Sequence, residues 1–119
     1  MADFASPKNI PTTGKVALLD ISDGEYETVA ASQTDQALGV TGALGDYLGG
    51  LLVIPATTSP GQVSIKDGSG SSIIVFTGGA SSVSNLVPFN IGLGILSAAG
   101  AWSVTTGASV SVIAMGNFT

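Results

Sequence analysis

Residues 20–27, Asp-Ile-Ser-Asp-Gly-Glu-Tyr-Glu, hold the densest group of side chains in this sequence that could do chemistry. Loop carboxylates are ligands that calcium prefers, but an EF-hand loop needs glycine at its sixth position and glutamate at its twelfth. Here Gly24 is fifth when counted from Asp20, and no Glu follows at the closing position. A looser calcium site remains an alternative. We interpret the stretch as an Asp-Gly turn between two strands, with Glu25 and Glu27 on the solvated face.

Most enzymatic chemistry lacks its residues in this chain, because the sequence contains no His, no Cys and no Arg. A Ser-His-Asp triad is therefore excluded, and zinc loses its usual nitrogen and sulfur ligands. None of the three lysines stands in a Ser-x-x-Lys spacing. A glycosidase pair would have to come from residues 20–27 or from Asp35 and Asp46, and nothing sets one carboxyl apart in an apolar pocket. We predict a protein that is not an enzyme, with no catalytic residue, metal or cofactor.

Charge is scarce and uneven along the chain. Charged residues make up 9% of the 119 residues, against about 25% in an ordinary globular domain. None occurs from residue 68 to residue 119, and the net charge is −5. Since nucleic-acid binding depends on cationic side chains that meet phosphates, we expect no DNA or RNA partner. A small domain with so much uncharged surface is typical of an oligomer or of a subunit in a larger assembly.

The first 14 residues predict an extended N-terminal arm ahead of a domain at 15–119. Pro7 and Pro11 each remove a backbone donor and disfavour helix in the residue before them. Phe4 and Ile10 are apolar anchors in an otherwise polar segment. We predict that these four residues contact a neighbouring subunit, with a frayed terminus as the alternative.

Neither a signal peptide nor a membrane span is expected. The first residues include an acid and no apolar core of the kind that a signal peptide has. The most apolar window, residues 86–101, is interrupted by Pro88, Asn90 and two glycines. It is also shorter than the roughly 20 residues that a spanning helix needs.

A period of two dominates after the arm, with apolar and small polar residues alternating. This pattern predicts antiparallel strands with one buried face. We expect strands near 15–21, 25–31, 36–40, 47–54, 62–67, 72–77, 86–96, 101–105 and 109–117, joined by Gly-rich turns such as the hairpin loop at 67–70. The apolar runs 51–54 and 73–76 are typical of strands covered on both faces. Helix is poorly supported, and the best candidate, 32–38, could equally be a bent strand.

The expected fold is all-β: an antiparallel two-sheet β-sandwich. A jelly roll is the favoured topology. An immunoglobulin-like sandwich is the second choice, although the Cys…Trp…Cys core of that fold is missing. Among the aromatic residues, Trp102 is expected in the core, with a sugar-stacking platform as the alternative. Tyr26 and Tyr47 are expected at a rim or an interface, because a phenol tolerates one wet end.

The segments VSIKDGSG, VPFNIGLGI and AWSVTTGASVSVIA resemble strands of structural proteins encoded by tailed bacteriophages. More narrowly, residues 45–118 are similar to small jelly-roll virion proteins, which include capsid decoration (cement) proteins and the heads of short fibres. This resemblance implies a subunit on the outside of an icosahedral shell, bound without covalent bonds to the major capsid protein. It also implies a homotrimer, with the arm from Phe4 to Pro11 clasping neighbouring capsomers.

The predicted function is therefore that of a capsid decoration subunit that bridges and stabilises capsomers. The first alternative is a receptor- or glycan-binding tip of a head or tail fibre. An exposed Trp102 or Tyr47 near carboxylates would favour that alternative. The second is a small secreted or pilus-type subunit, which the lack of a signal sequence weakens.

Overall fold

A computed structural model describes residues 24–119 of the chain, and within this range every regular element is a β-strand. The predicted arm at 1–14 and the predicted strand at 15–21 lie outside the described residues. The eight strands are β1 (Glu25–Val29), β2 (Gln36–Ala37), β3 (Tyr47–Pro55), β4 (Val63–Asp67), β5 (Ile73–Phe76), β6 (Phe89–Leu96), β7 (Trp102–Thr106) and β8 (Val110–Asn117).

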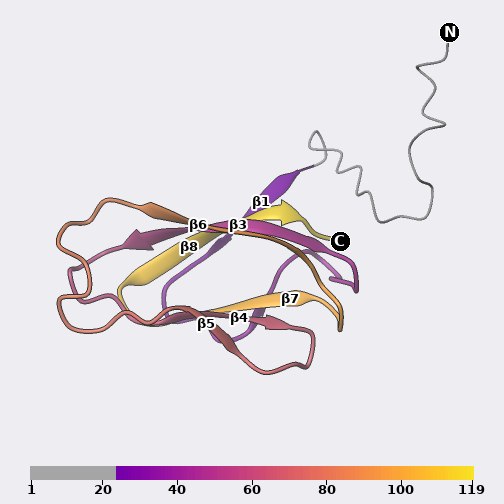
Figure 1. Ribbon diagram of the computed structural model, residues 1–119, viewed down its shortest axis with the longest axis horizontal. Helices are drawn as coiled ribbons and strands as arrows, with labels where there is room; N and C mark the ends of the chain where they lie inside the picture. The colour runs from indigo at the N-terminus through magenta and orange to yellow at the C-terminus, as the bar shows by residue number, and fades with distance from the viewer. Residues whose placement is uncertain (1–23) are drawn as a thin grey trace, which may run out of the picture.

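The strands form two antiparallel four-stranded sheets that pack face to face (Figure 1). The first sheet has the order β1-β8-β3-β6 and is the upper layer in Figure 1. The second sheet has the order β2-β7-β4-β5. The prediction of an all-β, two-sheet antiparallel sandwich is confirmed.

Strand pairing is nested along the chain. The first described strand pairs with the last, the second with the seventh, the third with the sixth and the fourth with the fifth, always antiparallel. Because residues far apart in sequence become neighbours, most of the fold depends on long-range pairing. The hairpin predicted at 67–70 is the innermost of these pairs, and the Gly70 amide donates to the Asp67 carbonyl at 2.9 Å. Its Gly68 has a φ of +56°, a backbone conformation that suits glycine.

The core lies between the sheets and follows from the alternation in the sequence. On β8, the inward Val110, Val112 and Ala114 are buried, whereas Ser111 and Ile113 between them are half-buried. The same alternation on β7 buries Trp102, which is 2% exposed. The prediction that Trp102 belongs to the core is confirmed.

Two apolar runs depart from their predictions. The run 51–54 is predicted to be covered on both faces, but Leu52 and Ile54 lie on the outer face of β3 and are only half-buried. The apolar run Ile73–Phe76 was expected to be covered on both faces, but it forms β5 at an edge of the second sheet. Ile73 and Ile74 are 48% and 53% exposed. A continuous apolar run indicates that a segment favours burial. It does not indicate whether the surface that buries it belongs to the same chain.

Candidate functional site

The four residues predicted to contact a neighbouring subunit, Phe4, Pro7, Ile10 and Pro11, lie outside the described residues. Residues 24–119 offer three other features that bear on function. They are the outer face of the first sheet, a pocket beside β1, and a polar cluster around Asp46.

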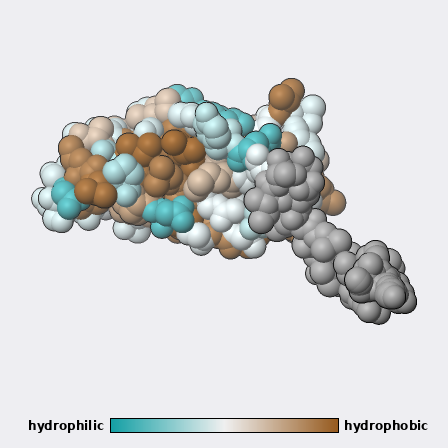
Figure 2. Space-filling model, turned by 90° about the horizontal axis from the view of Figure 1, so that it is seen from above, coloured by the Kyte–Doolittle hydropathy of each residue, from teal (hydrophilic) through white to brown (hydrophobic). Residues whose placement is uncertain are grey.

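Among residues 24–119, no charged side chain lies on the outer face of the first sheet. Strand register places Thr28, Ile113, Leu52 and Asn90 in one row across its four strands. Together with their neighbours on the same side they form what we call the neutral face: Tyr26, Thr28, Tyr47, Leu52, Ile54, Asn90, Gly92, Leu96, Ser111, Ile113, Met115 and Asn117. Figure 2 looks down on this side of the molecule and shows apolar residues gathered over part of it. In the sequence, this face is indicated by the absence of charged residues from 68 to 119, the range that supplies β6 and β8.

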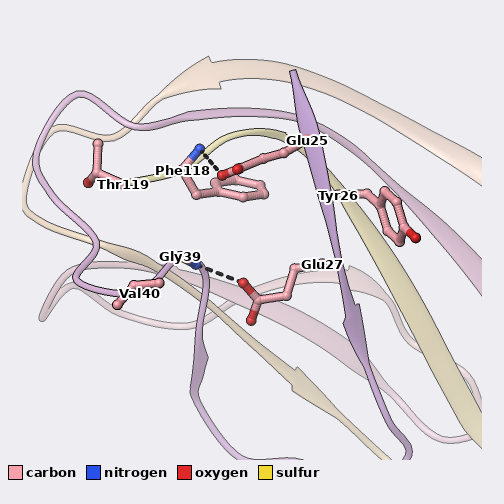
Figure 3. Close-up of a pocket in the computed structure, with 7 residues that line it drawn as sticks. All are labelled: Glu25, Tyr26, Glu27, Gly39, Val40, Phe118 and Thr119. Atoms are coloured by element: carbon pink, nitrogen blue, oxygen red, sulfur yellow. Dashed lines mark hydrogen bonds between the residues drawn. The ribbon is translucent and has the colours of Figure 1, made fainter. Parts of the chain in front are cut away.

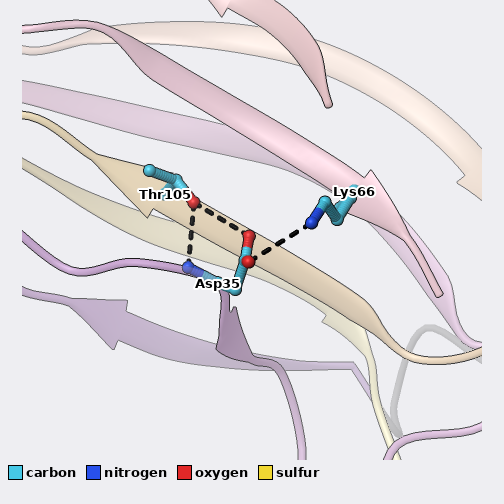
Figure 4. A network of polar contacts seen from close by, with 3 residues as sticks. All are labelled: Asp35, Lys66 and Thr105. Carbon is cyan, nitrogen blue, oxygen red and sulfur yellow. Dashed lines mark hydrogen bonds and ion pairs between the residues drawn. The ribbon is translucent and has the colours of Figure 1, made fainter. Parts of the chain in front are cut away.

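The outer face of the second sheet is polar by contrast. Lys66 on β4 pairs with Asp35 at 3.3 Å, and the Thr105 hydroxyl donates to the same carboxylate at 3.1 Å (Figure 4). Ser64 and Ser103 lie in register beside these residues. Ile74 on β5 pairs with Ser64 and is 53% exposed, so one apolar side chain shares this otherwise polar face. Of the two outer faces, only this one carries charged side chains among the described residues.

A pocket of about 240 Å³ lies beside β1, and the end of the chain lines its other side (Figure 3). Its lining combines the carboxylates Glu25 and Glu27 with the side chains of Tyr26, Val40 and Phe118. Tyr26 is 70% exposed, as expected for a rim residue.

The two pocket carboxylates are engaged by the protein itself. Glu25 accepts a hydrogen bond from the Phe118 amide at 2.8 Å. Glu27 accepts from the Gly39 amide at 2.8 Å and from Gln36 Nε2 at 3.1 Å. Both side chains share a strand face with the buried Val29. Glu25 is exposed, as predicted for the solvated face, whereas Glu27 is only half-exposed because the Gly39 amide and the Gln36 side chain hold its carboxylate.

The two pocket carboxylates therefore hold β1 in place, against Phe118 on one side and Gly39 and Gln36 on the other. Among residues 24–119 no group of three or more His, Cys, Asp or Glu side chains could hold a metal ion. Asp20 and Asp23 of the acidic stretch lie outside the described residues. No helix in the part of the chain that the structure describes is long and apolar enough to cross a membrane.

Asp46 is the one carboxylate in the described range that is fully buried, at 4% exposure. It accepts from the Ala43 amide at 3.0 Å and from the amide and hydroxyl of Thr119. The Trp102 indole donates to the Asp46 carbonyl at 3.0 Å. Sequence reasoning did not single out this structural cluster, because no local pattern marks it.

Neither Trp102 nor Tyr47 forms an open sugar platform next to carboxylates. The Trp102 ring is enclosed in the core, and its only polar atom is satisfied. Tyr47 is half-buried on the neutral face, where its ring covers Gly49. Comparison of the chain with protein-family models, with curated proteins and with solved structures found no match.

Proposed function

We propose that this chain is a non-enzymatic virion structural protein, a decoration subunit on the outside of a phage capsid. It binds the major capsid protein, bridges neighbouring capsomers and assembles as a homotrimer. In this proposal Phe4, Pro7, Ile10 and Pro11 clasp the shell.

The neutral face is the observation that carries the proposal. A face with half-buried Leu52, Ile54 and Ile113 and no charge loses little when water leaves it, and each Å² of apolar surface buried contributes about 25 cal/mol before association costs. The outer face of the second sheet carries the ion pair of Lys66 and Asp35, which favours contact with water. This asymmetry fits a subunit with one side against a partner and one side in water.

Nested strand pairing supports the jelly-roll part of the proposal. Eight antiparallel strands, paired first with last and inward to the fourth with the fifth, correspond to a long hairpin wound into two sheets. Jelly rolls of eight strands in two sheets are common in viral capsid and lectin domains.

Purified particles with and without the protein test the proposal. Particles that lack it should rupture at a lower temperature and under milder osmotic shock, while adsorption to host cells stays normal. Adding back the chain should restore stability. The variant Ile113→Glu, which puts a charge in the neutral face, should bind far less well than Ser103→Glu, the matched change on the polar face. Equal binding of two folded variants would contradict the assignment of the neutral face.

A receptor- or glycan-binding fibre tip is the second candidate. It is favoured by one end of the sandwich, where the uncharged loops 56–62 and 77–88 meet through hydrogen bonds such as Ser81 N to Ser59 Oγ at 3.0 Å. Leu86 and Val87 are exposed there. Scaffold-borne loops often carry recognition. Loss of adsorption with unchanged particle stability would favour this candidate.

A further inference from the structure

The two lateral edges of the sandwich are closed to different degrees. At the edge formed by β1 and β2, Glu27 bridges the sheets through its hydrogen bonds to Gln36 and Gly39. The inward Val29 of that edge is completely buried. The opposite edge is formed by β5 and β6, the outermost strands of their sheets among the described residues.

At the β5–β6 edge the core reaches the surface. All partly buried apolar residues that pack against the core belong to these two strands: Val75, Phe76, Phe89, Ile91 and Leu93. The rings of Phe76 and Phe89 meet across the opening, with centroids 5.3 Å apart. We call this edge, residues 73–76 and 89–96, the open seam.

The rims of the open seam are apolar as well. Ile73 and Ile74 on β5 are about half exposed, and Ile95 and Leu96 on β6 are 38% and 54% exposed. Natural sheets protect their edges with lysine, proline, inward charges or a covering element. The open seam has none of the charges, because no charged residue follows Asp67. An apolar edge of this kind, without protecting charges among the described residues, is a site at which another chain can pair.

We propose that further copies of this chain cover the open seam, so that the chains assemble seam to seam into a closed oligomer. The number of copies, three, rests on the proposed function. The inference adds the surface through which these copies meet. Any partner that brought charges to the seam would lose their hydration without gaining a counter-charge. The seam of a second copy brings only matching apolar side chains and strand edges.

The size of the seam suits a contact that three copies share. The eight residues of β6 span about 26 Å and the four residues of β5 about 13 Å at roughly 3.3 Å each, so with about 10 Å of width per strand edge the seam covers roughly 400 Å². Two seams in contact would bury about 800 Å², which is below a standard specific interface. Three seams that converge on one three-fold axis bury about 1,200 Å² in all, and this arrangement covers the seam of every copy.

The experiment measures the mass of the full chain in solution, by light scattering coupled to gel filtration. We expect the unmodified chain at a multiple of the 11.7 kDa chain mass. Ile74→Lys and Ile95→Lys should each reduce it to the single-chain mass at the same concentration. Ala37→Lys, the matched change on exposed β2 at the opposite edge, should keep the mass of the unmodified chain.

Circular dichroism of each variant shows whether it is folded, so a loss of the oligomer is not confused with unfolding. We expect the Ile74→Lys variant to stay folded, because Ile74 is 53% exposed. A single-chain mass for the unmodified protein at high concentration would overturn the inference. So would a folded Ile74→Lys variant that keeps the full oligomer mass. Neither measurement uses particles. A chain that stabilises capsids as a monomer would therefore overturn the seam contact and leave the proposed function in place.

Discussion

The carboxylate of Asp46 accepts hydrogen bonds from the backbone amide and the hydroxyl of Thr119, 73 residues away in the sequence, at 3.1 Å each. The Thr119 carbonyl in turn accepts from the Thr41 amide at 3.0 Å. These contacts join the segment after β8 to the loop before β3. A buried carboxylate is tolerated here because several donors surround it.

Replacing Asp46 with Asn should lower the free energy of unfolding by about 1–2 kcal/mol, because its charge-assisted, partly buried hydrogen bonds are weakened or lost. The matched change Asp35→Asn removes an ion pair whose side chains are 30% and 46% exposed, and it should cost at most about 0.5 kcal/mol. Urea denaturation followed by circular dichroism gives both values. Equal effects of the two changes would mean that the Asp46 contacts contribute no more than a surface ion pair.

Trp102 is the single tryptophan of the chain, so its fluorescence reports one environment. Because the ring is 2% exposed, its emission should be blue-shifted and resistant to iodide, and added sugars should leave it unchanged. Trp102→Ala should destabilise the fold by about 3–5 kcal/mol through the cavity it leaves. Strong iodide quenching in the native protein would contradict the core position.

Gly107 lies where two backbones meet. A Cβ added there would sit 2.8 Å from the Gly61 Cα and 2.9 Å from the Gln62 amide nitrogen. Gly107→Ala should therefore cost about 1–3 kcal/mol, as overpacking does. Gly92→Ala is the control, since nothing lies within 4 Å of its added Cβ. Thermal melts of the two variants should differ, and an unchanged melting temperature for Gly107→Ala would argue against this close approach.

Deleting residues 1–13 tests the proposed clasp. We expect the truncated chain to keep its β-sheet circular dichroism, because the core of the described residues 24–119 runs from Val29 to Phe118. Binding to capsids, measured by co-sedimentation with particles, should be lost. Full decoration of particles by the truncated chain would show that the arm is not the clasp and would leave the neutral face as the docking surface.

The sequence by itself determined the all-β class and most strand positions, because alternation is a local property. The pattern at 109–117 predicts a strand whose inward valines are indeed buried in β8. Likewise, the lone Trp102 on an alternating strand is correctly predicted as core. Such predictions succeed where each residue type prefers the environment that its own strand provides.

Tertiary structure decided the rest, since it depends on partners that are distant along the chain. Alternation in Glu25–Val29 defines two faces but not which one is inward. Glu27 turns inward because the Gly39 amide meets it there, and Asp46 is buried because Thr119 supplies donors. The edge position of Ile73–Phe76 follows from the nested pairing of all eight strands. A hydrogen bond between remote segments, or a strand's place at the edge of a sheet, leaves no periodic pattern in the sequence of either segment alone.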